Sequence, residues 1–577
     1  MNPNMFDRQL WLGFWRITRL YWQSTRKVRA WGVLSALLLL LLAAAGVNVL
    51  LNFVGRDFMT ALSEKDTSEF QRTLLIYLGA FVVATPVIAL FGWVKKVLGI
   101  DWREWLTGHF LDRYFADRAY YRINDDPNID NPDQRIAQDI NSFTSASLDF
   151  LSLIFFSLVQ LVSFIGILWS ISIPLVLSLV AYATAGTVIT MLFGKRLILL
   201  NFQQLRREAD FRFGLVHIRN NAESIAFYRG EEREKQQVNG RLGEVVANFR
   251  MLIGWERNVE LFTKGYEYVI LVLPIVIMAP LYFSGEIKFG VVTQAAGAFT
   301  TVLGALSIIV SQFTQLGNFA AGVTRLQSFA AALEPTKPPT ESPGAATPVT
   351  TIASREAPRL ALERVTLQTP NFEQTLLRSV SASVPPRGGL LIVGPSGTGK
   401  SSVLRAIAGL WNAGEGEITR PPLADMIFLP QRPYMVLGSL REQLLYPRID
   451  LATTDETFAD VLTQVNLPDL LHRTGGLDAV LDWSHILSLG EQQRLAFARL
   501  ILTRPAYAVL DEATSALDVA NEARLYAQLR GSGATYVSVG HRPSLFAFHD
   551  TVLELQGKGE WRVISAGEYL ATRPAGG

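Results

Sequence analysis

The stretch GPSGTGKSS, residues 394–402, fits the pattern GxxxxGK[ST] of a phosphate-binding loop. It follows the apolar run LLIV and opens the helix-forming run SSVLRAIAGL, which is the strand–loop–helix context that the pattern requires. Gly394, Gly397 and Gly399 would let the backbone wrap closely around phosphate oxygens. Lys400 would place its charge on the β- and γ-phosphates, and the Ser401 hydroxyl would ligate Mg²⁺. The other residues of the predicted nucleotide-binding loop are Pro395, Ser396, Thr398 and Ser402.

A second apolar run, AYAVLDE (506–512), ends in two carboxylates. Asp511 at the tip of this predicted strand would hold Mg²⁺, and Glu512 would polarise an attacking water. An acidic pair after a strand is by itself more often a solvated turn. Downstream of a phosphate-binding loop, the pair indicates nucleotide hydrolysis.

The last third of the chain alternates strand-like and helix-like segments. The strand-like runs are RLALERVTL, GLLIVG, MIFLPQ, YAVLDE and TYVSVG. This alternation predicts an α/β domain with a parallel core over residues 359–577. Residues 334–358 are rich in proline, threonine, serine and alanine, which is typical of a surface linker.

The composition indicates a membrane protein. Of the 577 residues, 49% are hydrophobic and 18% are charged, and the mean hydropathy is +0.23. The net charge of +2 gives no indication of a nucleic-acid partner. The absence of cysteine excludes disulfides and thiolate metal sites, and none of the six histidines has a metal-ligand spacing such as HExxH.

Six uncharged runs predict an all-α membrane domain over residues 30–333. The predicted spans are 30–55, 73–94, 150–169, 174–194, 266–285 and 289–324. Basic residues flank the start of the first span and the ends of the second, fourth and sixth spans, for example Arg29, Lys95, Lys195 and Arg325. With six crossings these ends lie on one side, which predicts that both termini are cytoplasmic. The segments 95–149 and 195–263 predict helices that extend the spans beyond the bilayer.

Residues 1–29 interleave aromatic side chains with arginines, as in Trp11, Trp15 and Tyr21. The pattern suits an amphipathic helix in the headgroup region of the bilayer. A helix packed on the protein's own surface explains the pattern equally well. A cleaved signal peptide is disfavoured, because about 30 residues precede the leucine run and a signal peptide has a short charged lead.

Five motifs together resemble the nucleotide-binding domain of ABC transporters. They are GPSGTGKSS, FLPQ, LSLGEQQR, VLDEATSALD and VGHR, in this order. The resemblance implies that Gln431 senses Mg²⁺ and the membrane domain, and that His541 contacts the γ-phosphate. It also implies that Asp518 closes the loop that begins at Ser515, and that ATP and Mg²⁺ are the cofactors.

The resemblance further implies a homodimer. In ABC proteins the segment that begins at Ser488 faces the phosphate loop of a second domain, and this chain has one set of motifs. Ser488, Gly490 and Glu491 would therefore bind ATP held by a partner copy. The segment has Leu489 where glycine is commonest and Glu491 where glutamine is commonest. Where the family usually has an adenine-stacking aromatic upstream of the phosphate loop this chain has Thr369, and Phe372 is the nearby candidate.

Four segments narrow the resemblance to the ABCD subfamily and its SbmA/BacA-like bacterial relatives fused to an ATPase. They are LSLGEQQRLAFAR, NPDQRI (131–136), ESIAFYRGEERE (223–234) and the aromatic lead. The subfamily implies the exporter-type fold, with coupling helices near 125–139 and 222–230. It implies an ATP-driven transporter of a bulky or amphipathic solute such as a fatty acid, an acyl-CoA, cobalamin or a peptide. The alternative is a membrane-anchored ATPase that regulates a partner complex without moving solute. A bacterial plasma membrane is the expected location, because no organelle-targeting extension precedes the lead.

Glu260, Lys264 and Glu267 are spaced by four and three residues, so they share one face of a helix before the fifth span. If this face lines a central cavity, the three side chains are candidate contacts for the cargo. A solvated row of ion pairs on a protruding helix end is the competing interpretation.

Overall fold

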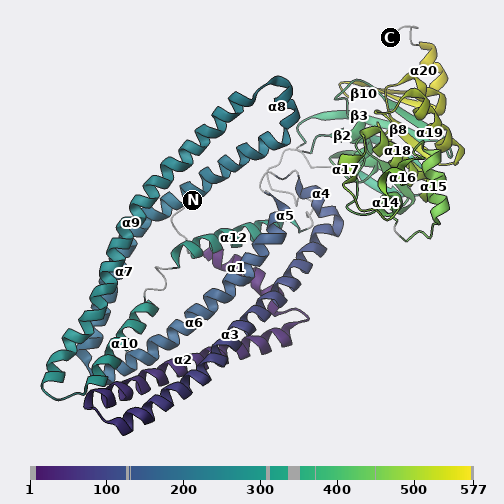
Figure 1. Cartoon of the computed structure of the whole chain (residues 1–577). Helices are drawn as coiled ribbons and strands as arrows, with labels where there is room; N and C mark the ends of the chain where they lie inside the picture. The colour runs from purple at the N-terminus through teal and green to yellow at the C-terminus, as the bar shows by residue number, and fades with distance from the viewer. Residues whose placement is uncertain are drawn as a thin grey trace. The chain divides into compact units, whose positions relative to one another are not determined.

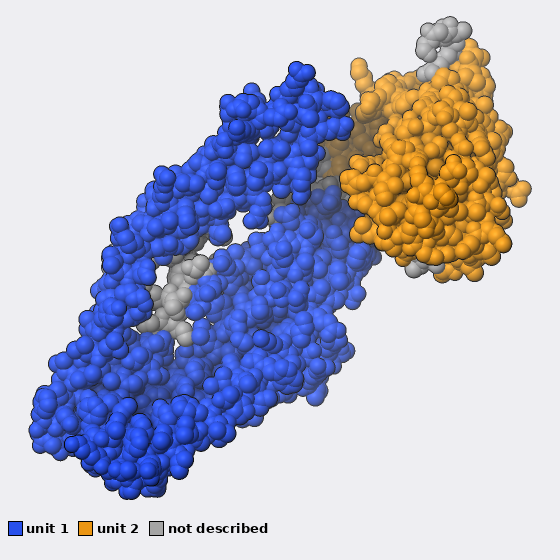
Figure 2. Space-filling view, in the orientation of Figure 1, with its two compact units in different colours: residues 1–336 blue, residues 337–577 orange. Residues whose placement is uncertain are grey.

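The computed structural model describes residues 8–124, 126, 129, 131–306, 312–334, 351–370, 372–448 and 450–572. The chain divides into two compact units, residues 1–336 and 337–577, which Figure 2 colours separately. The first unit is helical and the second combines helices with two sheets, which confirms the predicted fold class.

Long helices make up the first unit. Their bounds are α1 Arg8–Trp22, α2 Lys27–Glu64, α3 Thr67–Phe115, α6 Ile140–Ile171, α7 Ile173–Asn220, α9 Glu231–Phe283, α10 Phe289–Leu306 and α12 Phe313–Ala332. Short helices lie between them: α4 Ala119–Asn124, α5 Pro132–Gln134 and α8 Ala222–Tyr228.

Five helices in the described residues are long and apolar enough to cross a membrane, judged by length and composition. They are Lys27–Glu64, Thr67–Asn124, Pro132–Ile171, Glu231–Phe283 and Phe289–Leu306. A shorter apolar helical stretch, Ile173–Ile189, begins α7. The first five predicted spans therefore fall on α2, α3, α6, α7 and α9, and the helices continue well beyond them.

The sixth predicted span differs from the structure. Residues 289–324 were expected to form one helix, but α12 begins at Phe313 and the backbone of Gln312 is not helical (φ −98°, ψ 8°). Residues 307–311 of this prediction lie outside the described residues. The prediction is wrong at Gln312, because the length of an uncharged run does not indicate where a helix within it is interrupted.

Helix α1 packs on the protein, and its placement in the headgroup region stays a prediction. Ile17 and Tyr21 are buried in a core formed with α2, α3, α6 and α12. Trp11 and Trp15, on another face, are 56% and 64% exposed. The helix thus packs on the protein and also leaves indole rings outward, where a lipid headgroup region suits them.

Helices α7 and α9 run side by side, with α8 at the turn between them (Figure 1). The rings of Tyr182 and Tyr266 stack at 4.3 Å between centroids. Each hydroxyl donates to the other residue's carbonyl, at 2.6 Å from Tyr182 and 3.1 Å from Tyr266. Farther along the pair, Asn248 Nδ2 donates to the carbonyl of Leu200 at 3.0 Å. These contacts fix the register of the two antiparallel helices.

The second unit contains two sheets. One has the strand order β1-β5-β2-β3, with β1 Ala353–Glu356, β2 Leu360–Gln368, β3 Thr375–Val384 and β5 Gly414–Arg420. The other has the order β10-β9-β4-β8-β7-β6, with β4 Gly389–Val393, β6 Met426–Leu429, β7 Tyr507–Asp511, β8 Thr535–Val539, β9 Thr551–Gly557 and β10 Glu560–Ser565. Strands β9, β4, β8, β7 and β6 are parallel, as the alternation of strands and helices predicted.

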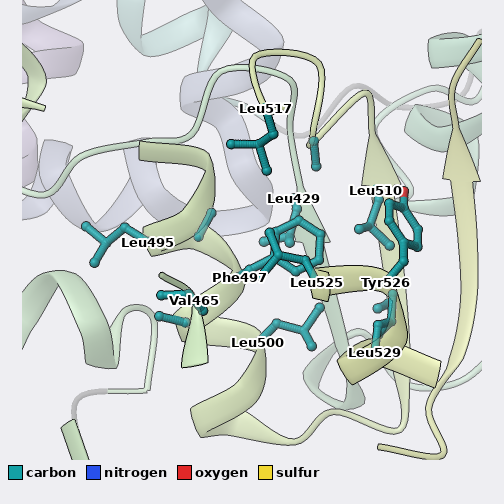
Figure 3. Packing of buried hydrophobic residues seen from close by; sticks show 14 of the residues in the cluster. Leu429, Val465, Leu495, Phe497, Leu500, Leu510, Leu517, Leu525, Tyr526 and Leu529 are labelled. Atoms are coloured by element: carbon teal, nitrogen blue, oxygen red, sulfur yellow. The ribbon is translucent and has the colours of Figure 1, made fainter. Parts of the chain in front are cut away.

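Eight α-helices of the second unit are described: α13 Lys400–Ile407, α14 Leu440–Leu445, α15 Asp455–Gln464, α16 Leu470–Thr474, α17 Trp483–Ile486, α18 Leu489–Thr503, α19 Val519–Gly531 and α20 Ala566–Thr572. The helices α18 and α19 bury leucine and aromatic side chains against β6 and β7 (Figure 3). This core fixes the strand ends from which the candidate site is built.

The predicted linker is shorter than expected. Residues 353–356 form β1, which pairs in parallel with β5 from Ala353 opposite Glu417 to Glu356 opposite Arg420. The second unit therefore has a strand before residue 359. Residues 335–350 of the predicted linker lie outside the described residues.

Candidate nucleotide-binding site

The glycine-rich loop joins the end of β4 to the start of α13. Gly394 has a φ of +147°, and a Cβ at this position would lie 2.3 Å from the carbonyl oxygen of Leu555. A side chain is therefore excluded where the loop leaves the sheet. The loop ends at Gly399, and α13 begins at Lys400 with the free backbone N–H groups of its first turn. Pro395, Ser396 and Gly397 are exposed, as an anion-binding cradle requires.

Lys400 lies under this loop and is 8% exposed. Its Nζ donates to the carbonyls of Gly394 at 2.8 Å and Pro395 at 2.9 Å. Burial lowers the pKa of the ammonium group, and the nearby carboxylates of Glu512 and Asp511 act in the opposite direction. A buried cation held against the loop fits a phosphate ligand, because the phosphate would supply the compensating charge.

Asp511 and Ser401 come together although 110 residues separate them. Strands β4 and β7 both pair with β8 in parallel, so their carboxyl ends lie at one edge of the sheet. The Ser401 hydroxyl donates to Asp511 Oδ1 at 3.1 Å. Burial raises the pKa of the Asp511 carboxyl, while the hydrogen bond from Ser401 lowers it. A hydroxyl beside a partly buried carboxylate provides the hard oxygen donors that Mg²⁺ prefers.

The Glu512 carboxylate contacts the side chains of Gln431 and His541. The backbone of Glu512 has a φ of +46°, which is unusual for a residue with a side chain, and its N–H donates to the carbonyl of Val539 at 3.2 Å. Gln431 Nε2 donates to Glu512 Oε2 at 2.9 Å, and His541 Nε2 lies 3.5 Å from Glu512 Oε1. Gln431 follows β6 and His541 follows β8, so three neighbouring strand ends present these side chains together.

The segment that begins at Ser488 has a different geometry. Ser488 caps α18, and its N–H and its hydroxyl both donate to Glu491 Oε2 at 2.9 Å. Arg473 Nη2 donates to the other oxygen, Glu491 Oε1, at 2.7 Å. Burial raises the pKa of the Glu491 carboxyl, but the hydrogen bonds from Ser488 and Arg473 outweigh it, so the pKa is lowered overall. Glu491 is thus held as a carboxylate at the start of the helix.

In the described residues no hydrogen bond or ion pair joins Ser488, Gly490 or Glu491 to the phosphate-loop residues 394–402. A Cβ at Gly490 would lie 3.2 Å from the carbonyl oxygen of Ala516, in the segment that ends at Asp518. Asp518 itself caps α19, and its carboxylate accepts from Asn521 N and Nδ2 at 2.7 Å each. Ser488 and Asp518 are both exposed, so each is available to another molecule.

Sequence reasoning missed Gln493 and Arg473. Gln493 is fully buried; its Nε2 donates to the carbonyl of Gln431 at 2.9 Å and its Oε1 accepts from Ala516 N at 3.0 Å. It therefore connects α18 to the segments that carry Gln431 and Asp518. The second glutamine of LSLGEQQR had the right position for this role, but only the packing of α18 shows its partners.

The two positions considered for the adenine contact lie in one turn. Thr369 and Phe372 lie in the turn between β2 and β3, where Phe372 N donates to the carbonyl of Thr369 at 2.8 Å. Phe372 has a φ of +60° and is 36% exposed. Its ring is accessible for stacking on a base.

The three candidate cargo residues lie on α9. Lys264 Nζ pairs with Glu267 Oε2 at 2.8 Å, and these side chains are 57% and 53% exposed. Glu260 is exposed as well. The contacts within the chain match an ion-pair row, and the exposure leaves the same face available to a ligand.

Comparisons with known proteins identify both units as parts of ABC transporters. Residues 17–283 match the family described as "ABC transporter transmembrane region 2", and residues 377–515 match the family described as "ABC transporter". An uncharacterized ABC transporter ATP-binding protein of Synechocystis is 50% identical over 92% of this chain and 81% of its own length.

Two further relatives have more specific names. The "ABC transporter D family member 2, chloroplastic" of Arabidopsis thaliana is 41% identical, over 95% of this chain and 86% of its own length. The "Lysosomal cobalamin transporter ABCD4" of Mus musculus is 32% identical, over 96% of both chains.

Proposed function

The chain belongs to the ABC transporter family, among the ABCD half-transporters. From that premise we propose that two copies of the chain share two ATP molecules and move a bulky or amphipathic solute across the membrane. ATP binding, ATP hydrolysis and membrane transport follow from the family. The single observation that carries the catalytic proposal is the position of the Glu512 carboxylate, which contacts Gln431 and His541 beside the phosphate loop.

We assign the phosphate contacts to the loop 394–402. Its backbone N–H groups and Lys400 Nζ would bind the β- and γ-phosphates, because all are donors gathered around one cradle. Ser401, Asp511 and Gln431 would hold Mg²⁺, which supplies positive charge to the developing phosphate oxygens.

Glu512 would orient and polarise the attacking water, since its carboxylate is an acceptor fixed by neighbours on both oxygens. His541 would then contact the γ-phosphate from the adjacent strand end.

The homodimer proposal rests on the separation between the two halves of the site. Ser488 caps the 15-residue helix α18, whose N-terminal N–H groups favour an anion. Among the residues that the structure describes, neither Ser488 nor Gly490 forms a hydrogen bond or ion pair with the chain's own phosphate loop. Ser488, Gly490, Glu491 and Asp518 would therefore face ATP held by the partner copy, with Arg473 neutralising the Glu491 carboxylate. The coupling segments are proposed at residues 222–230, which include α8, and at residues 125–139. Of the second segment, residues 125, 127, 128 and 130 lie outside the described residues.

We propose a bacterial plasma membrane as the location, with both termini cytoplasmic. Bacterial relatives support this location: one is the Synechocystis protein, and another is an inner-membrane ABC transporter ATP-binding protein of Escherichia coli, 31% identical over 90% of this chain. The cargo classes are fatty acids or acyl-CoA, cobalamin, and peptides. Glu260, Lys264 and Glu267 would contact the cargo from α9.

The test of catalysis is Glu512→Gln in protein reconstituted into lipid nanodiscs. We expect ATP binding to persist and turnover to be lost, because the amide cannot act as the base. Glu363→Gln, in an exposed ion pair of the same unit, is the matched control and should keep wild-type turnover. Wild-type turnover in Glu512→Gln would remove Glu512 from the mechanism.

Two further measurements test sharing and cargo. Nanodiscs that hold one copy should hydrolyse ATP far more slowly per chain than nanodiscs that hold two, and equal rates would refute the shared site.

In proteoliposomes, ATP turnover should rise with one of a panel of acyl-CoAs, fatty acids, cobalamin and peptides. Replacing Glu260, Lys264 and Glu267 together by glutamine should alter that transport and leave basal turnover intact. A complete lack of stimulation and of uptake would favour a regulatory ATPase instead.

A further inference from the structure

A cavity of about 270 Å³ lies between α7 and α9, in the part of the helix pair that continues beyond the apolar start of α7. We call it the α7–α9 cavity. Three arginines line it, Arg196 from α7 and Arg250 and Arg257 from α9, together with Trp255 and Gly254. These residues are not part of the proposed ATP site.

The α7–α9 cavity gathers three positive charges. In the described part of the chain, no carboxylate forms an ion pair with Arg196, Arg250 or Arg257. Arg257 donates to Asn258 Oδ1, at 3.4 Å from Nε and 3.2 Å from Nη2. Three guanidinium groups around one hollow repel one another, so an anion that enters it would be stabilised by all three.

The shape of the cavity favours a ligand of limited size. A Cβ on Gly254 would meet no atom within 4 Å, so the missing side chain leaves the hollow open. Trp255 supplies a flat apolar wall next to the guanidinium groups. Guanidinium groups bind phosphate oxygens through paired N–H donors, and the indole ring packs against the adjoining carbon atoms.

The position of the cavity indicates where such a phosphate would come from. Arg196 follows the apolar stretch Ile173–Ile189 by seven residues, which is about 10 Å along a helix. The contacts at Tyr182–Tyr266 and Leu200–Asn248 place residues 250–258 of α9 beside this part of α7. Basic residues and tryptophan at the end of a membrane span are typical of the interface with lipid headgroups.

We propose that the α7–α9 cavity binds a phosphate-bearing anion, with the headgroup of an anionic phospholipid as its source. The inference is independent of the proposed ATP site, because it concerns a different unit of the chain. A bound headgroup would link α7 and α9 at the level where they leave the bilayer.

The test uses the full chain in nanodiscs of phosphatidylcholine mixed with phosphatidylglycerol. Native mass spectrometry counts the lipids that stay bound after transfer to mild detergent. Wild type should retain phosphatidylglycerol in preference to phosphatidylcholine, and the double variant Arg196→Gln/Arg250→Gln should reduce this preference roughly tenfold or more. Gly254→Leu should reduce it as well by filling the hollow, without changing the charge.

Arg233→Gln is the matched control, because it removes one exposed arginine from the same helix away from the cavity. It should keep the lipid preference of wild type. Basal ATP turnover in all four proteins shows that they fold, since none of the substituted residues lies in the nucleotide site.

A second arm distinguishes the two sources of phosphate. Radiolabelled inorganic phosphate is added to the same proteins in detergent without anionic lipid. If lipid retention depends on the two arginines and on Gly254, the ligand of the cavity is a lipid headgroup. If phosphate binding shows the same dependence and no lipid is preferred, the ligand is a soluble phosphate. Equal behaviour of wild type, the double variant and Gly254→Leu in both arms would overturn the proposal.

Discussion

Replacing Arg473 by alanine should weaken the use of ATP by the proposed dimer, through its effect on Glu491. The Glu491 carboxylate accepts from Arg473 on one oxygen, at 2.7 Å, and from Ser488 on the other, at 2.9 Å. Glu491 is 15% exposed, whereas Arg473 is 50% exposed. The arginine therefore neutralises a mostly buried carboxylate next to the hydroxyl that would face the partner's γ-phosphate.

The size of the effect follows from the distances. A phosphate oxygen that accepts from Ser488 would lie roughly 5 Å from the Glu491 carboxylate. Two unit charges at that separation repel by about 3 kcal/mol at an effective dielectric of 20, and by about 1 kcal/mol in water. Without Arg473, the KM for ATP should therefore rise between about fivefold and about a hundredfold.

The assay is ATP turnover in nanodiscs over a range of ATP concentrations, so that KM and kcat are measured separately. Arg473→Ala should raise KM, and the added change Glu491→Gln should restore it, because the amide keeps the shape and removes the charge. Arg359→Ala, which breaks an exposed ion pair with Glu363, is the control and should leave KM unchanged. A KM of Arg473→Ala within about twofold of wild type would refute the reasoning, and so would a double variant as impaired as the single one.

Three other predictions concern the second unit. Burial lowers the pKa of His549 from 6.5 to about 4. Between pH 6.5 and pH 4 the unfolded chain therefore binds a proton at His549 that the folded chain does not bind. The contribution of His549 to stability is complete above pH 6.5 and falls as the pH drops toward 4. His549→Phe should flatten this dependence in urea unfolding followed at several pH values, and an unchanged slope would contradict the assignment. Arg499 donates to the carbonyls of Gln443 at 2.6 Å and Tyr434 at 2.8 Å, and Arg499→Met should lower the unfolding free energy by roughly 2–4 kcal/mol in the same assay. Gly394→Ala would place a Cβ 2.3 Å from the carbonyl oxygen of Leu555, so binding of a fluorescent ATP analogue should be lost, and near-normal binding would show that the loop tolerates a side chain.

Much of the candidate site was predictable because its residues follow strands directly. Asp511, Glu512 and His541 come after apolar runs, and the carboxyl ends of parallel strands meet at one edge of a sheet. Once the runs were recognised as neighbouring strands, the positions of these side chains followed. The roles of Gln431, His541 and Asp518 came from the resemblance of the ordered motifs to ABC proteins.

The features that sequence did not predict depend on partners far away in the chain. Strand β1 has the sequence ASRE, which is exposed and polar and has no apolar alternation, and it forms only because β5 pairs with it. The ion pair of Arg473 with Glu491 joins helix α16 to the first turn of α18, and no local pattern indicates it. The interruption at Gln312 likewise lies within a run that is uncharged throughout.

The buried amide of Gln493 connects the parts of the second unit that would serve different ATP molecules. One of its contacts is the carbonyl of Gln431, whose side chain touches Glu512 at the chain's own phosphate loop. Its other contacts are Ser515 Oγ at 3.2 Å and Ala516 N at 3.0 Å, beside Gly490 and the Ser488 cap that would face the partner's ATP. Because a fully buried amide loses hydrogen bonds if either segment shifts alone, the segments of Gln431 and Asp518 are constrained to move with α18. A change at one nucleotide would in this way alter the surface presented to the other, which gives the proposed pair of sites a physical reason to act together.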